Sequence, residues 1–292
     1  MSNLLSLGYP ISDVEDIKKY APSVFSEHAN AKLSNRYSFV STNELLNDFD
    51  KLGWKPTHVK QNGQKSYARH IVRLTNDNLG FMDLNNDKVR PQIVIDNSHN
   101  GGSSAKLYMG LFRLICTNGL VVSMPGMYTS VKLRHVGIKM DELKKLMEIV
   151  INQYKVINTH IDEMQRVIIT PEQSEQFVIK AMAVREPHLF INADGTINEQ
   201  KVTSYIKPME ILQPLRSEDS NNDLWSIFNN IQEHFVKGSF ERTNMNGRHT
   251  TPHPITNATR NIDYNKKLWD IAESYMLEGA KEVEEVNSLI LS

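Results

Sequence analysis

Residues 54–75, WKPTHVKQNGQKSYARHIVRLT, carry the strongest structural signal of the chain. Two runs whose residue character alternates with a period of two, 54–61 and 66–75, flank the dipeptide Asn62-Gly63. Asn-Gly is the preferred pair for a two-residue turn between antiparallel strands. The pattern therefore predicts a β-hairpin.

The segments on either side of this hairpin predict a helix before it and further strands after it. Thr42–Leu52 has apolar residues at helical spacing, Ser41 and Glu44 form a capping-box pattern, and Gly53 follows. The run Gln92–Asp96 (QIVID) predicts a third strand. For 106–123 we favour strands, although part of its apolar spacing also suits a helix.

The second half of the chain has helical periodicity. Helices are predicted at 141–167, 170–185, 222–237 and 264–286, while 238–261 has no periodicity. The fold class is therefore α+β, with an N-terminal antiparallel sheet and capped helix followed by a helical C-terminal part. We expect the division at 1–138 and 139–292.

Composition excludes several classes of protein. With 292 residues and 40% hydrophobic content the chain can bury a sizeable core, and a single cysteine, Cys116, excludes an internal disulfide. The apolar neighbours of Cys116 predict a buried, unreactive thiol. Neither a membrane span nor a signal peptide is apparent, so we expect a cytoplasmic protein.

Charge divides unevenly along the chain and suggests contact with a polyanion. Residues 1–138 carry 16 Lys+Arg against 11 Asp+Glu, and the remainder carries 17 against 23. In the second hairpin strand, alternation places Tyr67, Arg69 and Arg73 on one face, as in surfaces that stack bases and track phosphates of single strands. An ordinary solvent-facing strand gives the same pattern.

A cationic loop at 238–261 interrupts the acidic second half. It contains Arg242 and Arg248, and it could contact phosphates, an acidic partner or the chain's own carboxylates. The histidines His249 and His253 also lie in this loop, but they lack a carboxylate partner that would complete a metal site. We expect no metal site and no cofactor.

A polar, glycine-rich turn follows the third strand. Its backbone N–H groups could cradle an anion, although a plain connecting loop explains the sequence as well. The candidate anion-binding residues are Ser98, His99, Gly101, Gly102 and Ser103. No Walker motif is present, and a hydrolase built on His99 lacks an identifiable nucleophile and base, so we expect no enzyme and assign no catalytic residue.

Taken together, several segments resemble one family: the phage- and plasmid-borne domain of unknown function typified by the YfjQ, YafZ and YubP proteins. The matching segments are Pro22–Ser26, Arg36-Tyr37, Asn97–His99, Gly110–Arg113, Cys116–Leu120, Asn222–Trp225 and Asn265–Trp269. Family members usually have Asp where this chain has Asn100, which argues against a catalytic or metal-binding carboxylate in the turn. The order of elements is also similar to the core of phage single-strand annealing proteins such as Redβ, RecT and Erf.

The resemblance implies a role on mobile DNA. The first expectation is a nucleic-acid-binding protein of mobile genetic elements that binds or anneals single-stranded DNA. The alternative is an anti-defence (anti-restriction) protein that acts by binding a host protein. Neither requires a membrane, and whether the protein forms a homo-oligomer is left open.

Overall fold

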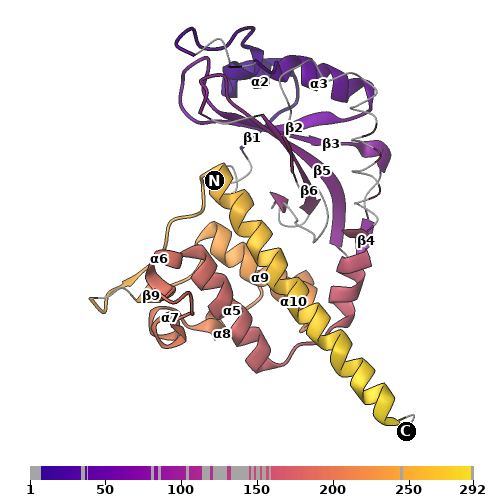
Figure 1. Ribbon diagram of the computed structural model, residues 1–292, viewed down its shortest axis with the longest axis vertical. Helices are drawn as coiled ribbons and strands as arrows, with labels where there is room; N and C mark the ends of the chain where they lie inside the picture. Colours follow the sequence, from indigo (N-terminus) through magenta and orange to yellow (C-terminus); the bar gives the residue numbers. More distant parts are fainter. Residues whose placement is uncertain are drawn as a thin grey trace. The chain divides into compact units, whose positions relative to one another are not determined.

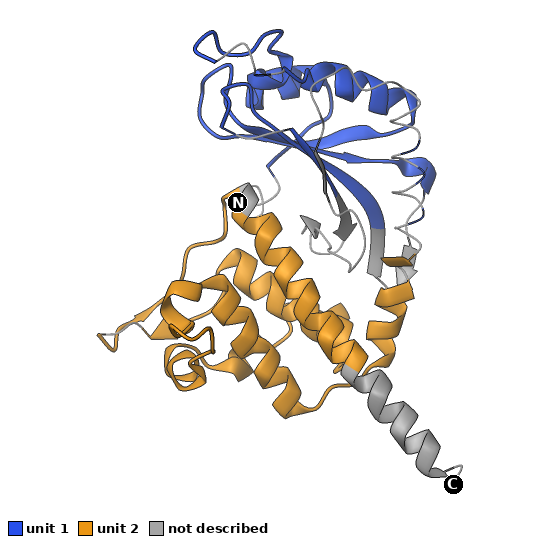
Figure 2. Ribbon diagram, in the orientation of Figure 1, with its two compact units in different colours: residues 1–155 blue, residues 156–292 orange. Residues whose placement is uncertain are grey.

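The computed structural model describes most of the chain. The described residues are 8–79 apart from 34–36 and 38, then 82–84, 87–102, 105–113, 119–120, 130–132, 145, 148, 152 and 156–290 apart from 158, 244 and 245. They form two compact units, residues 1–155 and 156–292 (Figure 2). The expected division at 138 and 139 lies outside the described residues and stays a prediction.

Unit 1 is built on an antiparallel sheet, shown with its helices in Figure 1. Its described strands are β1 (Tyr9–Pro10), β2 (Lys55–Gln61), β3 (His70–Thr75), β4 (Met82–Leu84), β5 (Asp87–Asn97), β6 (Lys106–Arg113), β7 (Gly119–Leu120) and β8 (Ser130–Lys132). The strand order is β1-β2-β3-β5-β6-β7, with β4 paired to β5 and β8 to β6. The predicted hairpin is confirmed, because β2 and β3 pair antiparallel with Val59 opposite Val72.

The second strand of that hairpin is shorter than the sequence predicts. The Ala68 N–H donates to the Lys65 carbonyl at 2.9 Å, which makes a turn where alternation suggested strand. The strand β3 consequently begins at His70 rather than Ser66. The strand preference at 106–123 is confirmed where residues are described, since β6 pairs with β7 through Leu111 and Leu120. Cys116 lies outside the described residues.

One face of this sheet is covered by helices. They are α2 (Val14–Tyr20), the 3-10 helix η1 (Pro22–Phe25) and α3 (Thr42–Lys51). The Ser41 side chain caps α3 by accepting from the Glu44 N–H, as predicted. Leu45, Leu46 and Phe49 of α3 join a cluster of buried residues that includes Trp54 and Val72.

Unit 2 is helical. After a helical segment at 159–166, its elements are α5 (Pro171–Arg185), α6 (Pro187–Phe190), α7 (Glu199–Tyr205), α8 (Pro208–Ile211), η3 (Ser217–Asp219), α9 (Leu224–Lys237), β9 (Arg242–Thr243), β10 (His249–Thr250) and α10 (Ala258–Ile290). The predicted ends of α5 and α9 are confirmed: Thr170 caps α5 and Gly238, at φ 67°, ends α9. Within the part of the chain that is described, no helix is long and apolar enough to cross a bilayer.

The segment between α9 and α10 differs from the expectation. We predicted no regular structure at 238–261, but β9 and β10 pair there, with Arg242 opposite Thr250. The last helix also begins earlier than the predicted Tyr264. The helix begins at Ala258 because the Asn257 side chain caps it, accepting from the Arg260 N–H at 3.0 Å.

Candidate functional site: an arginine-lined pocket in unit 2

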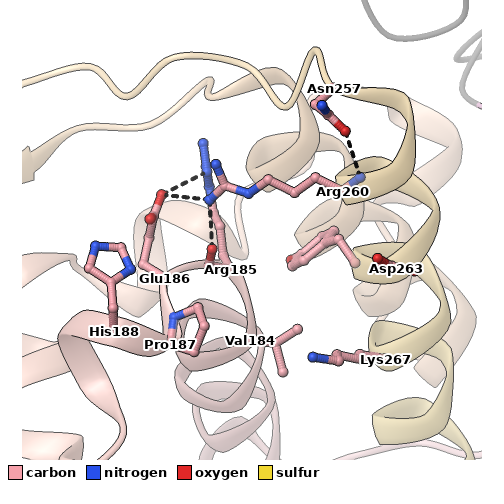
Figure 3. Close-up of a pocket in the computed structure, with 10 residues that line it drawn as sticks. Val184, Arg185, Glu186, Pro187, His188, Asn257, Arg260, Asp263 and Lys267 are labelled. Atoms are coloured by element: carbon pink, nitrogen blue, oxygen red, sulfur yellow. Dashed lines mark hydrogen bonds and ion pairs between the residues drawn. The ribbon is translucent and has the colours of Figure 1, made fainter. Parts of the chain in front are cut away.

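A cavity of about 750 Å³ opens between the end of α5 and the first turns of α10 (Figure 3). Its lining residues are Val184, Arg185, Glu186, Pro187, His188, Asn257, Arg260, Asp263, Tyr264 and Lys267. Those on α10 recur at intervals of three and four residues, which places them on one helical face. The two helices pack against one another, so that face meets the end of α5.

Arg185 is the most deeply buried charge in this pocket. It is 3% exposed, and its guanidinium lies over the Phe240 ring with 5.5 Å to the centroid. One terminal nitrogen, NH2, donates to the His253 carbonyl at 2.7 Å. The other guanidinium nitrogens, Nε and NH1, are buried without a hydrogen-bond partner. Arg185 thus has one hydrogen bond, and its other guanidinium nitrogens are closed to solvent.

Arg260 lies next to Arg185, and the two guanidiniums share one carboxylate (Figure 3). Arg260 NH2 donates to the Arg185 carbonyl at 2.8 Å and lies 3.3 Å from Glu186 Oε1. Arg185 NH1 is 3.8 Å from the same oxygen, beyond hydrogen-bond distance. A single carboxylate therefore faces two cations.

The surroundings of Arg185 act on its pKa in both directions. Burial is the main cause that lowers the pKa of Arg185, and the charges of Arg260 and Arg242 lower it further. Tyr264 and Glu186 raise the pKa of Arg185. Arg242 itself lies in β9, outside the lining of the pocket.

Tyr264 adds a neutral donor to the pocket. It is 3% exposed, and its hydroxyl is buried without a hydrogen-bond partner. Burial raises the pKa of the phenol above its usual range, so the group stays protonated at neutral pH.

The cationic loop predicted at 238–261 contributes its arginines from the β9–β10 hairpin. Arg242 NH1 donates to the Tyr205 hydroxyl at 2.6 Å, and its guanidinium lies over that ring at 5.6 Å from the centroid. Arg248 is exposed near the other end of the hairpin. Tyr205 is half-buried, so part of an aromatic ring borders the cations.

The base of this hairpin is held to the helices. The Ile255 N–H donates to the Val236 carbonyl at 2.9 Å. The Pro252 carbonyl oxygen would lie only 2.3 Å from a Cβ added to Gly238, so glycine alone fits there. The bond from Arg185 to the His253 carbonyl fixes the same stretch to the pocket.

The hairpin residues predicted to contact nucleic acid in unit 1 are placed differently. Arg73 is 1% exposed and donates to Gln92 Oε1 at 2.8 Å, while burial lowers its pKa to about 10. Arg69 forms a two-pronged ion pair with the buried Asp96, and Tyr67 is half-buried. Tyr67 and Arg69 lie before β3, and Arg73 within it is buried, so the assumption that Arg73 is a surface residue is wrong.

The predicted anion-binding turn is buried at its first two residues and exposed at Gly101 and Gly102. Ser98 and His99 have no exposed surface, and the Gly102 N–H already donates to Asn100 Oδ1 at 2.9 Å. Gly101, at φ 78°, adopts a conformation that favours glycine, which suffices to explain its presence. Ser103 lies outside the described residues.

Instead, several segments that carried the family resemblance meet in a buried polar cluster. Ser23 Oγ and Thr42 Oγ1 bond the two ring nitrogens of His70, at 2.7 and 2.8 Å. Asn97 Nδ2 donates to Thr42 Oγ1 at 2.9 Å, and the His99 ring lies 5.1 Å from that of His70. These side chains are at most 2% exposed, so a substrate could not reach Ser23 or His70 without opening the core.

Sequence reasoning missed Arg185, Tyr264 and Lys267 as site residues. Arg185 was only the end of a predicted helix, and Lys267 lay inside a segment matched to the family. Only Arg260 belonged to the predicted cationic loop. In the described part of the chain, no three His, Cys, Asp or Glu side chains gather as a metal site would require.

Comparison with known proteins identifies relatives of unknown activity. The family described as "Domain of unknown function (DUF932)" matches residues 31–269. The "UPF0380 protein YafZ" of Escherichia coli K12 is 28% identical over 95% of this chain and 96% of its own length. The "UPF0380 protein YfjQ" of the same strain is 27% identical with the same coverage. No solved structure matches.

Proposed function

Since the chain belongs to the DUF932 family, whose description assigns no activity, we propose from the geometry of unit 2 that it binds single-stranded nucleic acid. The observations that carry the proposal are the pair of arginines in the pocket lining, Arg185 and Arg260, which face one carboxylate, and Arg242 of the β9–β10 hairpin, which packs on Tyr205. Phosphates of a nucleic-acid backbone are the polyanion that such a group suits.

The surroundings of these arginines support a nucleic acid over a simple anion. Arg242 packs on the half-buried Tyr205 ring, and exposed Arg248 extends the cationic surface along the hairpin. Proteins that bind single strands combine a cationic track with aromatic rings on which bases stack. The role on mobile DNA that the resemblance implies is consistent with such binding.

This proposal moves the binding surface from unit 1 to unit 2. Arg69 and Arg73 are engaged with Asp96 and Gln92, and binding through them would first require these bonds to break. Arg242 and Arg248 keep the role that the sequence suggested for them.

The test is a salt series of binding by fluorescence anisotropy, with a labelled oligo(dT) strand and its duplex. We expect wild-type affinity to fall steeply with salt, and Arg242→Gln/Arg248→Gln to lower the slope by about one to two units. The matched control is Arg166→Gln, which removes an exposed arginine of unit 2 outside the pocket.

Two outcomes would count against the proposal. An equal loss in the control would mean that net charge, not this surface, controls binding. No binding at any salt concentration would refute it and leave the anti-defence role, with a host protein as partner.

A further inference from the structure

The turn between β9 and β10 contains the dipeptide Asn246-Gly247. Both residues are exposed, Gly247 has a φ of 73°, and no described atom lies within 4 Å of the place where a Cβ on it would sit. Asparagine is a thermally labile residue. It reacts when the backbone nitrogen of the next residue attacks its side-chain carbonyl carbon, and glycine hinders this attack least because it has no Cβ.

The reaction needs only water as a second reactant. The Gly247 backbone nitrogen forms a bond to Cγ of Asn246, the bond from Cγ to Nδ2 breaks, and Nδ2 leaves as ammonia with the proton of the attacking nitrogen. Water then adds to one carbonyl carbon of the resulting five-membered imide and breaks its bond to nitrogen. The product is aspartate or, when the other bond opens, isoaspartate. No electrons are transferred in either step.

The structure distinguishes this dipeptide from the other exposed Asn-Gly pairs that it describes, which are Asn62-Gly63 and Asn100-Gly101. Ring closure requires the backbone to change conformation, and segments held by few hydrogen bonds open most readily. The Asn62 N–H donates to the Arg69 carbonyl at 2.9 Å, at the end of strands that pair at six positions. Asn100 Oδ1 accepts from the Gly102 N–H at 2.9 Å. By contrast, β9 and β10 pair at only two positions, so the turn at Asn246 should react first.

The place of Asn246 in the hairpin gives the modification a consequence for charge. Residues 242–250 contain two arginines, Arg242 and Arg248, and no carboxylate. Arg242 is held by neutral acceptors, since its NH1 donates to the Tyr205 hydroxyl at 2.6 Å and its Nε to Thr250 Oγ1 at 3.2 Å. A carboxylate at position 246, two residues from exposed Arg248, reduces the formal charge of this stretch from +2 to +1.

We propose that Asn246 is a deamidation site, and that its conversion to aspartate or isoaspartate lowers the affinity of the β9–β10 hairpin for anions. The covalent change is independent of any ligand. Its effect on a nucleic-acid strand rests on the proposed function. Under this inference a protein molecule loses binding strength as it ages.

The first measurement follows the modification by mass spectrometry of peptides from the full chain after incubation at mildly alkaline pH. Replacement of NH2 by OH adds about 1 Da. We expect peptides with Asn246 to gain this mass before those with Asn62 or Asn100. Asn246→Gln should remove the gain, because the attack would then have to close a six-membered ring. Equal or faster gain at Asn62 or Asn100 would overturn the assignment.

The same incubation in guanidinium chloride tests whether the fold sets the order of reaction. Without the folded structure the three Asn-Gly pairs should react at similar rates. An order that persists in the denaturant would overturn the structural ranking.

The second measurement compares the affinities of the wild type, Asn246→Asp and Asn62→Asp for labelled oligo(dT) by fluorescence anisotropy. Both variants add one negative charge at an exposed asparagine, so they differ in the hairpin that carries it. We expect Asn246→Asp to weaken binding about threefold to tenfold at low salt and to lower the salt slope by about one unit. Asn62→Asp should change both values little.

The inference and the proposed function fail separately. Equal binding by Asn246→Asp and the wild type overturns the claim that this site regulates binding, while strand binding itself stands. A wild type that binds no strand overturns the proposed function, and its mass spectra still decide whether Asn246 is the modified residue. Absence of any mass gain at Asn246 overturns the site itself.

Discussion

Two groups of arginines, one in each unit, have opposite relations to their surroundings. In unit 1, Arg69 is paired with Asp96 and Arg73 is bonded to Gln92. In unit 2, Arg185 is as deeply buried but keeps two guanidinium nitrogens without acceptors. Burial alone therefore does not separate a structural arginine from a binding one. Arg69 and Arg73 bond side-chain acceptors of neighbouring strand residues, whereas the hydrogen bond of Arg185 goes to the His253 carbonyl.

The largest effect on stability is expected from truncating Arg73. Arg73→Ala should lower the free energy of unfolding by about 3–5 kcal/mol, because it leaves a cavity and an unpaired buried Gln92 side chain. Arg73→Met should cost less, since it fills the space without a charge. Urea unfolding with hydrogen exchange on β3 peptides measures the effect.

The contrasting variant is Arg260→Ala in unit 2, whose ion pair with Glu186 is partly exposed. It should cost within about 1 kcal/mol. If Arg73→Ala proved as mild as Arg260→Ala, the arginines of unit 1 would not be structural.

Acid should destabilise unit 1 through its buried histidines. Burial lowers the pKa of His70 to about 3 and that of His99 to about 4, from 6.5. Below pH 6.5 these histidines bind protons in the unfolded chain but stay neutral in the folded chain. Their contribution to the free energy of unfolding is therefore fully present above pH 6.5 and is lost as pH falls toward 4. His99→Phe should remove about 2–3 kcal/mol of the loss between pH 7 and 4.5.

The measurement is urea unfolding of both proteins at the two pH values. Taking the difference between them cancels the titration of carboxylates elsewhere. A wild type and a variant with the same pH dependence would show that His99 is protonated in the folded state.

Removing the carboxylate of Glu186 should raise the affinity of unit 2 for anions. Glu186→Gln takes away the negative charge that Arg185 and Arg260 share, so affinity for a labelled single strand should rise about threefold to tenfold. Glu163→Gln, an exposed change on the helical segment 159–166, is the control. Unchanged or weaker binding by Glu186→Gln would place the anion elsewhere.

The smallest effect is expected at Arg248. Arg248→Ala should change the free energy of unfolding by less than about 0.5 kcal/mol, because the residue is exposed. The salt slope of binding should fall by about one unit. Thermal melting and anisotropy on the same samples check both parts, and a large loss of stability would make Arg248 a structural residue too.

Local chemistry explains which parts of this fold could be predicted from the sequence. The pairing of β2 with β3 follows from their period of two, although the connection is longer than a turn at Asn62-Gly63 alone, and the end of α9 at Gly238 depends on a residue whose preferred backbone is known. The start of β3 was missed because the Lys65 carbonyl captures the Ala68 N–H, a bond that alternation does not reveal.

The sites depend on partners far apart in the chain. Arg260 bonds the Arg185 carbonyl across 75 residues, and Ser23 bonds His70 across 47. A period of two places Arg73 on a face, but it cannot say whether other residues cover that face. Neither the pocket nor the polar cluster could therefore be predicted without the three-dimensional structure.

The anchoring of the β9–β10 hairpin has a consequence for the thermodynamics of binding. A flexible arm would lose conformational entropy when a ligand orders it, and that loss would reduce affinity. Here the Ile255 N–H is bonded to the Val236 carbonyl and the His253 carbonyl to Arg185 before any ligand arrives, and Gly238 leaves room for Pro252 beside it. Arg242 is therefore held in position in advance, and association through it should cost little ordering entropy. Loosening the anchor, for instance at Gly238, would weaken binding without removing a single cation from the surface.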